Sequence, residues 1–544
     1  MQKLFILLSL FSVMFSSLYA QYPTQAEVDN LLKDLPFESP KITVPTFPDR
    51  TFNILERGAT GNGIFKNTEI INNTIIECSR AGGGKVVIPH GVWLTGPITM
   101  QSNVNLHLEE GALVVFSADI DDYRLVGSNF SNIESQINGS NLENVAITGR
   151  GIFNGNGAKW RPVKKEKTTA RQWREFTRTG EVSADGNTWY PRVGTIAAIE
   201  LKQRTPSSEL RTRQANERVK LTMRPYLLNI EGVKNMVVEG VTLQNSAHIA
   251  NMLRRIDGLV MKDVKVLNQW WSQNADGLDI SACHNVLLYN CVVNTGDDGI
   301  CMKSTRTAHQ LGEFALENIV IKDCKVFHGH GGFVIGSNTD GGMNNIFVQN
   351  LTCAWTQTGL RFKSGIGRGG RVQNIFIEDV FMKDIMNEAI IFEVEYTDSG
   401  AITSADHYES SAKIPDFNGI SMRNIICESA GRNAISVRGS EDVLIRNVTI
   451  QDAVLQAGAG ASFNFAEGIT LDNVHILPAS GVTYLFNQTS NVTLKNMPSS
   501  QEIGNDFMVL MGNRTNNILL RNTNVKPENI KASANMQAGA FRIE

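Results

Sequence analysis

The segment ENIVIKDCKV, residues 317–326, alternates apolar and polar residues in two short runs separated by Lys322 and Asp323. The same design recurs as KNMVVEGVTL at 234–243, DGLVMKDVKV at 257–266, HNVLLYNCVV at 284–293 and NNIFVQNLTC at 344–353. A period of two residues predicts β-strands with one side facing the core. From Asn235 onward most copies follow one another after 23 to 33 residues, and a repeat of that length indicates a solenoid.

The fold class follows from the length of the repeat. A coil this short can close only if its parallel strands stack on those of the next coil, so we expect an all-β, single-stranded right-handed parallel β-helix. A propeller would need longer repeats of antiparallel strands, and a leucine-rich array would contain far more leucine. Residues 67–81 (NTEIINNTIIECSRA) carry apolar residues at 70, 71, 75 and 76. This pattern predicts an amphipathic helix that caps the amino-terminal end of the solenoid.

The chain divides into unequal parts. Residues 1–20 have Lys3, an apolar stretch from Leu4 to Phe15 and small residues up to Ala20, which is the layout of a signal peptide cut near Ala20 and predicts an exported protein. We expect an N-terminal extension at 21–50, the β-helix at 51–530 and a C-terminal tail at 531–544. An insertion rich in Lys, Arg and Trp interrupts the repeat at 155–224. It is either a solvated surface segment or one wall of a cationic site.

Composition excludes several classes of function. The 544 residues carry a formal net charge of −3, and no basic excess suggests nucleic acid as a partner. No stretch after the signal peptide is apolar enough to span a membrane. The seven cysteines form no CxxC pair and no zinc-ligand spacing with histidine, so we expect no metal and mostly small, buried thiols. We expect a monomer.

Consecutive coils gather polar residues on one outer face. ADGLDIS, DDGICMKS, HGGFVIGS and QTGLRFKS align on the glycine that opens one strand of each coil. The residues one and three places after it are apolar and face the core, so the residues two and four places after it face outward. The outward rows are Asp279, Cys301, Val334 and Arg361, and Ser281, Lys303, Gly336 and Lys363. Before the glycine, Asp276 shares a row with Asp298, and Asp297 shares a row with His330.

This cluster suits acid–base chemistry on a charged sugar. Carboxylates held close together cannot all ionise easily, so one of them keeps a proton near neutral pH. A glycosidase uses one carboxylic acid to protonate the leaving oxygen and another carboxylate to activate water. Arg361, Lys363 and Lys303 would bind a uronate. Turn formation by Asp-Gly and calcium binding are the structural alternatives, and the spacing leaves open whether Asp297 or Asp298 holds the proton.

Four motifs carry a resemblance to a known family. Asn274-Ala-Asp276-Gly, Gly296-Asp297-Asp298-Gly, Gly329-His330-Gly331 and Arg361-Phe-Lys363 resemble, in order and spacing, the signature motifs of glycoside hydrolase family 28, the polygalacturonases. The resemblance extends from about residue 50 over nearly the whole chain. It implies hydrolysis of α-1,4 links between galacturonic acid residues of pectic polysaccharides by single displacement with inversion, without a cofactor.

The resemblance also implies a role for each matched residue. Asp297 would be the general acid, Asp276 and Asp298 would activate water, and His330 would tune the acid. Arg361 and Lys363 would hold a uronate carboxylate, and Asn274 would orient sugar hydroxyls or the coil turn. Lys303 and Tyr396 are further candidates for substrate binding, Tyr396 because an aromatic ring suits sugar stacking.

The sequence departs from the family pattern at a few positions. Ala275 replaces the usual threonine, Phe362 replaces a β-branched residue, and Lys303 adds a charge. The intact aspartate pair favours a polygalacturonase over enzymes that cleave rhamnogalacturonan, and the alternative is a galacturonosidase acting on rhamnogalacturonan or another branched pectin. The insertion at 155–224 is similar to those of exo-acting members. Two rival hypotheses are a pectate-lyase-like enzyme and a non-catalytic carbohydrate-binding β-helix.

Overall fold

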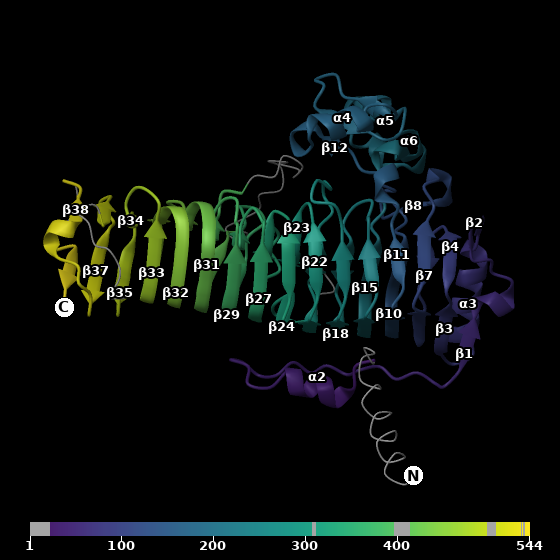
Figure 1. Ribbon diagram of the computed structural model, residues 1–544, viewed down its shortest axis with the longest axis horizontal. Helices are drawn as coiled ribbons and strands as arrows, with labels where there is room; N and C mark the ends of the chain where they lie inside the picture. The colour runs from purple at the N-terminus through teal and green to yellow at the C-terminus, as the bar shows by residue number, and fades with distance from the viewer. Residues whose placement is uncertain (1–21, 307–311, 397–413, 498–506, 535, 537–538) are drawn as a thin grey trace, which may run out of the picture.

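The computed structural model describes residues 22–306, 312–396, 414–497, 507–534, 536 and 539–544, so the predicted signal peptide lies outside the described residues. Thirty-four of the described strands form one continuous sheet, whose strands pair in parallel from coil to coil. The coils stack along the long axis of the molecule (Figure 1). This confirms the predicted right-handed parallel β-helix.

Each coil contributes strands to three faces. The first face contains β5 (Ile98–Thr99), β17 (Asn251–Arg254), β20 (Leu278–Ser281), β23 (Asp298–Lys303), β26 (Gly331–Ile335), β28 (Leu360–Lys363), β30 (Ile390–Glu393), β34 (Tyr484–Asn487), β36 (Met508–Met511) and β38 (Ile530–Ala532). The second face contains β1 (Thr51–Asn53), β3 (Gly84–Ile88), β6 (Val104–Leu108), β18 (Asp257–Lys262), β21 (His284–Tyr289), β24 (Leu316–Lys322), β35 (Ser490–Lys495), β37 (Asn516–Arg521) and β39 (Phe541–Ile543). The third face contains β2 (Asn62–Lys66), β4 (Gly91–Thr95), β7 (Ala112–Phe116), β11 (Ile152–Asn154), β16 (Thr242–Gln244), β19 (Lys265–Leu267), β22 (Val292–Thr295) and β25 (Lys325–His328).

Seven long strands bend from one face to another. They are β10 (Ile137–Gly149), β15 (Leu228–Glu239), β27 (Met343–Ala354), β29 (Arg371–Lys383), β31 (Asp416–Arg438), β32 (Ile445–Asn464) and β33 (Ala466–Pro478). Because β38 and β39 pair with β36 and β37, the sheet continues almost to the end of the chain. The predicted end of the coils at residue 530 is therefore too early, since Phe541 and Ile543 are still partly buried against the last coil.

The core consists of apolar rows inside the coils. The predicted inward rows are in register, Leu278 with Ile300 and Ile280 with Met302, and they continue through the following coils. The two rows run over six coils, from Leu278 and Ile280 to Ile435 and Val437, and all twelve of their residues are fully buried. Within one row, the rings of Phe362 and Phe392 stack with their centroids 4.3 Å apart. Identical positions of neighbouring coils thus lie about one strand spacing apart.

The capping helix is α3 (Thr68–Arg80), as predicted. Its buried face consists of Ile71, Thr74, Ile75 and Cys78, and it packs on the first coils. The predicted face differs at its edges, because Ile70 is only packed against the rim of the core. The spacings of three and four residues in the buried set are those of a single helical stripe.

The recurrent Asn and Asp residues form the turns between the second and third faces. Asp263, Asn290, Asp323 and Asn350 all have left-handed backbone conformations, with φ between 51° and 57°. Short polar side chains tolerate this conformation. The amide of Asn290 donates to Asp263 at 2.6 Å, and that of Asn350 donates to Asp323 at 2.6 Å. Stacked hydrogen bonds between coils therefore account for the polar residues in the repeat.

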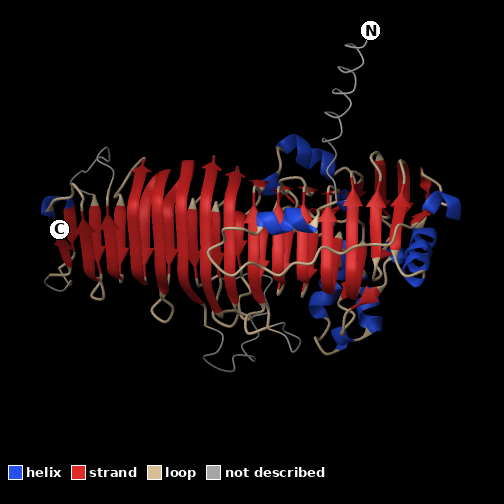
Figure 2. Cartoon of the chain, turned by 90° about the horizontal axis from the view of Figure 1, so that it is seen from below, coloured by secondary structure: helices blue, strands red, loops and turns tan. Residues whose placement is uncertain are grey.

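The N-terminal extension forms a strap across the outside of the second face, and it contains α2 (Gln25–Leu31) (Figure 2). Val28, Leu32, Ile42 and Val44 of the strap pack on an outward-facing apolar row. This row consists of Ala146, Val237, Val260, Leu287, Val320 and Phe347. Where these coils carry an apolar residue outside, the strap keeps it from water.

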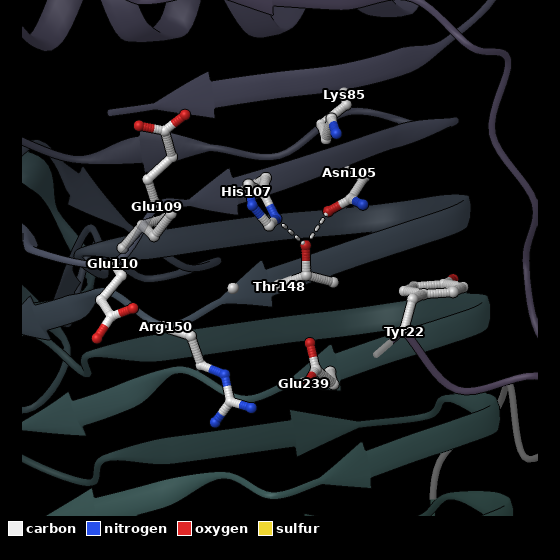
Figure 3. Close-up of a pocket in the computed structure, with 11 residues that line it drawn as sticks. Tyr22, Lys85, Asn105, His107, Glu109, Glu110, Thr148, Arg150 and Glu239 are labelled. Carbon is white, nitrogen blue, oxygen red and sulfur yellow. Dashed lines mark hydrogen bonds between the residues drawn. The ribbon is translucent and has the colours of Figure 1, made fainter. Parts of the chain in front are cut away.

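A cavity of about 370 Å³ lies at the amino-terminal end of the strap. Tyr22 and Glu239 line it together with Thr148, whose hydroxyl donates to Oδ1 of Asn105 at 2.7 Å and accepts from Nδ1 of His107 at 2.8 Å (Figure 3). Glu239 is 3% exposed, and its Oε1 has no hydrogen-bond partner among the described residues. Burial raises the pKa of Glu239 to about 7.

The insertion folds into a small unit of its own. It contains β12 (Val163–Lys164), β13 (Glu181–Val182) and β14 (Thr188–Tyr190) in a three-stranded sheet, and α4 (Ala170–Phe176), α5 (Thr195–Arg204) and α6 (Arg213–Arg218). Next to it lies the hairpin of β8 (Leu125–Val126) and β9 (Asn132–Ile133). Buried Arg161 donates to the carbonyl of Ser246 at 2.7 Å and to Asn245 at 3.0 Å. The unit lies on the opposite side of the coils from the strap (Figure 1).

All seven cysteines belong to the described residues, and each is a buried free thiol. This confirms their prediction as small core side chains. Among the described helices, none has the length and apolar character needed to cross a membrane.

Candidate functional site

A cleft of about 760 Å³ lies over the first-face strands of four coils, β20, β23, β26 and β28. The predicted rows are confirmed, because Asp279 pairs with Cys301 and Asp298 pairs with Gly331. The cleft brings together most of the predicted site residues, namely Asn274, Asp276, Asp297, Asp298, Lys303, His330, Lys363 and Tyr396. Arg361 does not line the cleft directly, but its Nη1 lies 3.9 Å from Oδ1 of Asp298.

Asp298 is held as a carboxylate by cations. It is 2% exposed, and the ammonium of Lys363 donates to its Oδ2 at 2.7 Å. Burial alone would raise the pKa of Asp298, but Lys363, Lys303 and Arg361 together hold it far below its usual range. Asp298 is therefore ionised at neutral pH. Its carboxylate can polarise a water molecule or accept a proton from that water.

Asp297 is oriented by three hydrogen bonds. The backbone N–H of Asn274 donates to its Oδ2 at 3.1 Å, and the N–H of Asp298 donates to its Oδ1 at 3.0 Å. Nδ1 of His330 lies 3.0 Å from the same Oδ1. Burial favours the neutral acid, but the hydrogen bond and charge of His330 outweigh it and lower the pKa of Asp297. Asn274 thus acts through its backbone, in a left-handed turn at φ 54°.

Asp276 and Asp279 have the opposite protonation tendency. Burial, followed by the charges of Asp279 and Asp297, raises the pKa of Asp276 well above its usual value. Asp279 is fully buried, and burial raises its pKa to about 6. Among the four aspartates, the resident proton therefore belongs to Asp276 or Asp279, whereas the sequence left it on Asp297 or Asp298. The expected repulsion exists, but Lys363 and His330 decide which carboxyl it affects.

Lys303 is a counter-ion in this arrangement. Its ammonium lies 3.2 Å from Oδ1 of Asp279 and 3.6 Å from Oδ2 of Asp276. The carboxylates of Asp279 and Asp276 raise the pKa of Lys303 against the opposing effect of burial. Lys303 lines the cleft, but its charge is already balanced within the protein by the carboxyl groups of Asp279 and Asp276, which share one proton.

The side chains of Arg361 and Lys363 both lie over the aromatic ring of Tyr396. The ring of Tyr396 lies 4.9 Å from the Lys363 ammonium and 5.5 Å from the Arg361 guanidinium, measured to the ring centroid. On the next coils, Arg438 donates to buried Glu388 at 2.7 Å and lies 3.8 Å from Glu393. Glu393 in turn lies 3.9 Å from Arg361. These charges fix Arg361 between coils.

Several cleft residues lie outside the four motifs. The insertion contributes Lys164, Glu166 and Lys167, which confirms the interpretation of the insertion as one wall of the site. Arg224, at its end, donates to Oδ1 of Asn274 at 2.9 Å. His248, Gln273, Gln357, Ser337, Asn338 and Arg368 also line the cleft. The basic composition of the insertion hinted at Lys164 and Lys167, whereas no signal in the sequence pointed to the cleft residues outside the insertion.

The cleft offers one group of potential metal ligands. Carboxylate oxygens of Asp297 and Asp298 and a ring nitrogen of His330 lie within 4.8 Å of one another. The ammonium of Lys363 already binds Asp298. A divalent cation would have to compete with this buried ion pair, so the arrangement fits acid–base chemistry better than metal binding.

Comparison with known proteins places the chain among carbohydrate-active enzymes. The profile of glycosyl hydrolases family 28 matches residues 208–475, which include the whole carboxylate cluster. An exo-poly-alpha-D-galacturonosidase of Dickeya chrysanthemi is 27% identical over 426 residues. That match covers 74% of this chain and 66% of the relative, slightly less than two thirds of its length.

Known structures agree with this placement. A hyperthermoactive exopolygalacturonase of Thermotoga maritima is 26% identical, with a TM-score of 0.63 over 80% of this chain and 94% of that one. A family 28 exopolygalacturonase of Yersinia enterocolitica shares the fold, with 20% identity and a TM-score of 0.62 over 82% of this chain and 78% of that one. With its parallel β-helix, its four motifs and the clustered aspartates, this chain is similar to the glycosyl hydrolases of family 28.

Proposed function

We propose that this protein hydrolyses α-1,4-galacturonosidic bonds of polygalacturonate or a related pectic polysaccharide, with inversion. The observation that carries the proposal is the cluster of Asp276, Asp297 and Asp298 in a cleft that also presents Lys363, Lys167 and Arg368. Carboxyl groups supply the acid and the base for breaking a glycosidic bond, and the cations complement a uronate. The names of the relatives in Dickeya and Thermotoga support this substrate class.

Within this proposal, each charged group has a task. Asp298, ionised by Lys363, activates the attacking water together with Asp276. Lys363 and Arg361 bind the uronate carboxylate at the cleavage point, and Tyr396 packs against the sugar beside them. Asp297 protonates the leaving oxygen. No cofactor takes part, and the protein acts as an exported monomer after cleavage near Ala20.

The resident proton must reach Asp297 when substrate binds. In the free protein it is on the side of Asp276, whose pKa is raised by burial and by the carboxylates of Asp279 and Asp297. A bound uronate brings a negative charge next to Lys363 and weakens the cationic field over the cluster. This favours the neutral form of Asp297, while Asp276 becomes free to ionise as a base. The four aspartates titrate as one coupled set.

The insertion supports an exo mode of attack. It folds against the coils through Arg161 and forms one wall of the cleft with Lys164 and Lys167. Digestion of polygalacturonate should then release mono- or digalacturonate within the first minutes while viscosity falls slowly. An early ladder of longer oligomers would indicate an endo mode. A product with an unsaturated, ultraviolet-absorbing end would indicate a lyase and contradict hydrolysis.

Three variants test the assignment of the acid. Asp297→Asn should lower kcat on polygalacturonate by about 10²- to 10⁴-fold, the usual contribution of a general acid. The same variant should recover most of its rate on an aryl α-galacturonide, whose leaving group needs no proton. Asp298→Asn should be impaired on both substrates, because its loss affects the water. If Asp276→Asn, rather than Asp297→Asn, is recovered by the aryl substrate, Asp276 is the acid.

A further inference from the structure

The insertion places one lysine directly behind the catalytic histidine. The Nζ atom of Lys167 lies 3.3 Å from the carbonyl oxygen of Gly296 and 3.4 Å from Nε2 of His330. Lys167 belongs to none of the four motifs and is 163 residues away from His330 in sequence. The second ring nitrogen of His330, Nδ1, faces Asp297 at 3.0 Å. His330 is thus enclosed between an ammonium group and a carboxyl group.

Lys167 is held in place on both sides. The preceding β12 pairs with β14, and the backbone N–H of Lys165 donates to the carbonyl of Asn187 at 2.9 Å. The following α4 begins at a capping box, in which Thr169 and Gln172 exchange hydrogen bonds with each other's backbone. A residue fixed between a paired strand and a capped helix keeps a constant position, unlike an exposed lysine.

The chemistry of the two groups assigns the proton of the ring. An ammonium group has donors only, so Nε2 of His330 must offer its lone pair to Lys167. Nε2 then carries no proton, and the single proton of the neutral ring lies on Nδ1, from which it is donated to Oδ1 of Asp297. An imidazolium would direct an N–H and a positive charge at Lys167, and the other neutral tautomer would direct an N–H at it.

We propose that Lys167 is a positioning residue that holds His330 as the neutral tautomer with its proton on Nδ1, and thereby keeps Asp297 able to carry the proton of the reaction. The proposal rests on the role given to Asp297 above. An imidazolium beside Asp297 would keep this carboxyl group ionised. An ionised carboxylate has no proton to donate to the leaving oxygen. A neutral ring still orients the carboxyl by one hydrogen bond without adding charge. With the ring neutral, the hydrogen bond from Nδ1 of His330 is the part of its influence on the pKa of Asp297 that persists.

The direct test is spectroscopic and needs no substrate. Protein labelled with ¹⁵N in the histidine rings is examined at neutral pH, and His330→Gln identifies the signals of His330. The wild type should show the proton on Nδ1. In Lys167→Met, the proton should move to Nε2 or the ring should become doubly protonated. Lys167→Arg keeps a donor and should preserve the Nδ1 pattern. Lys165→Met, an exposed neighbour outside the cleft, should preserve it too.

Kinetics separate positioning from substrate binding. Lys167→Met should lower kcat on polygalacturonate by about tenfold or more with little change in KM, since it affects proton transfer. An Nε2 proton in the wild type, or an unchanged ring pattern in Lys167→Met, would overturn the proposal. So would an increase in KM alone. If the ring pattern changes as expected but the wild type releases no sugar from polygalacturonate, the proposed function fails and the tautomer assignment stands.

Discussion

Glu239→Gln should stabilise this protein at alkaline pH, although it removes a charged group. Glu239 is 3% exposed on the second face, its Oε1 has no partner among the described residues, and burial raises its pKa to about 7. Figure 3 shows its side chain near Thr148 and Tyr22. An unfolded chain releases the proton of this residue above a pH of about 4.5. The folded protein retains it up to about pH 7, so the folded state binds more protons in this window. Its stability therefore falls as the pH rises from about 4.5 to 7.

The magnitude follows from the two pKa values. The difference between 4.5 and about 7 corresponds to about 3 kcal/mol when the carboxyl is isolated from water. The neighbouring cavity of about 370 Å³ admits water that screens the charge, so about 2 kcal/mol is the expected gain in Glu239→Gln at pH 8. At pH 4 the two proteins should be equally stable, because glutamic acid and glutamine are then both neutral.

The assay is urea-induced unfolding of the wild type and of Glu239→Gln at pH 4, 6 and 8, followed by tryptophan fluorescence. The difference in unfolding free energy should grow with pH between 4 and 7 and then level off. Glu109→Gln, at an exposed residue of the same cavity, is the matched control and should show no such growth. A difference that is independent of pH, or a loss of stability in Glu239→Gln at pH 8, would refute the reasoning.

Two further predictions concern the counter-ion and the strap. Lys303→Met removes the ammonium that pairs with Asp279 and Asp276. The pKa of Asp276 should therefore rise, and the acidic limb of the pH profile of kcat/KM should move to higher pH. An acidic limb that does not move would contradict the role of Asp276 as a base. Val260→Asp places a charge under the strap, where Val260 is 1% exposed, and should cost about 3 kcal/mol in urea unfolding. Thr449→Asp, in the same outward row beyond the strap, should leave the free energy of unfolding nearly unchanged. Equal losses of unfolding free energy in both variants would show that the strap does not shield Val260 from water.

The coils and the rows of the site follow from local pattern. Alternation with a period of two decides which residues of DDGICMKS face the core, and stacking of coils then places Asp298 beside Asp276 and Asp297 beside His330. These relations need only the sequence, because neighbouring coils of a solenoid contact one another in a fixed order. The capping helix was predictable for the same reason, although its buried face turned out to include Thr74 and Cys78.

The electrostatics of the site could not be predicted in this way. Lys363 binds Asp298 across two coils, and Lys303 binds Asp279, which faces outward but is fully buried. A pKa depends on burial and on distances of a few ångströms, and the repeat does not encode either. The sequence predicted a retained proton on Asp297 or Asp298, whereas burial raises the pKa of Asp276 and Asp279 in the free protein.

By itself, the sequence determined the β-helix, the stacked rows and the four motifs, because each depends on residues close in sequence or one coil apart. Only the tertiary structure decided how the strap covers Val260 and how the insertion brings Lys167 to 3.4 Å from His330. Both are contacts between segments that do not belong to the repeat. Their positions depend on how separately folded pieces pack, and no periodic pattern specifies that packing.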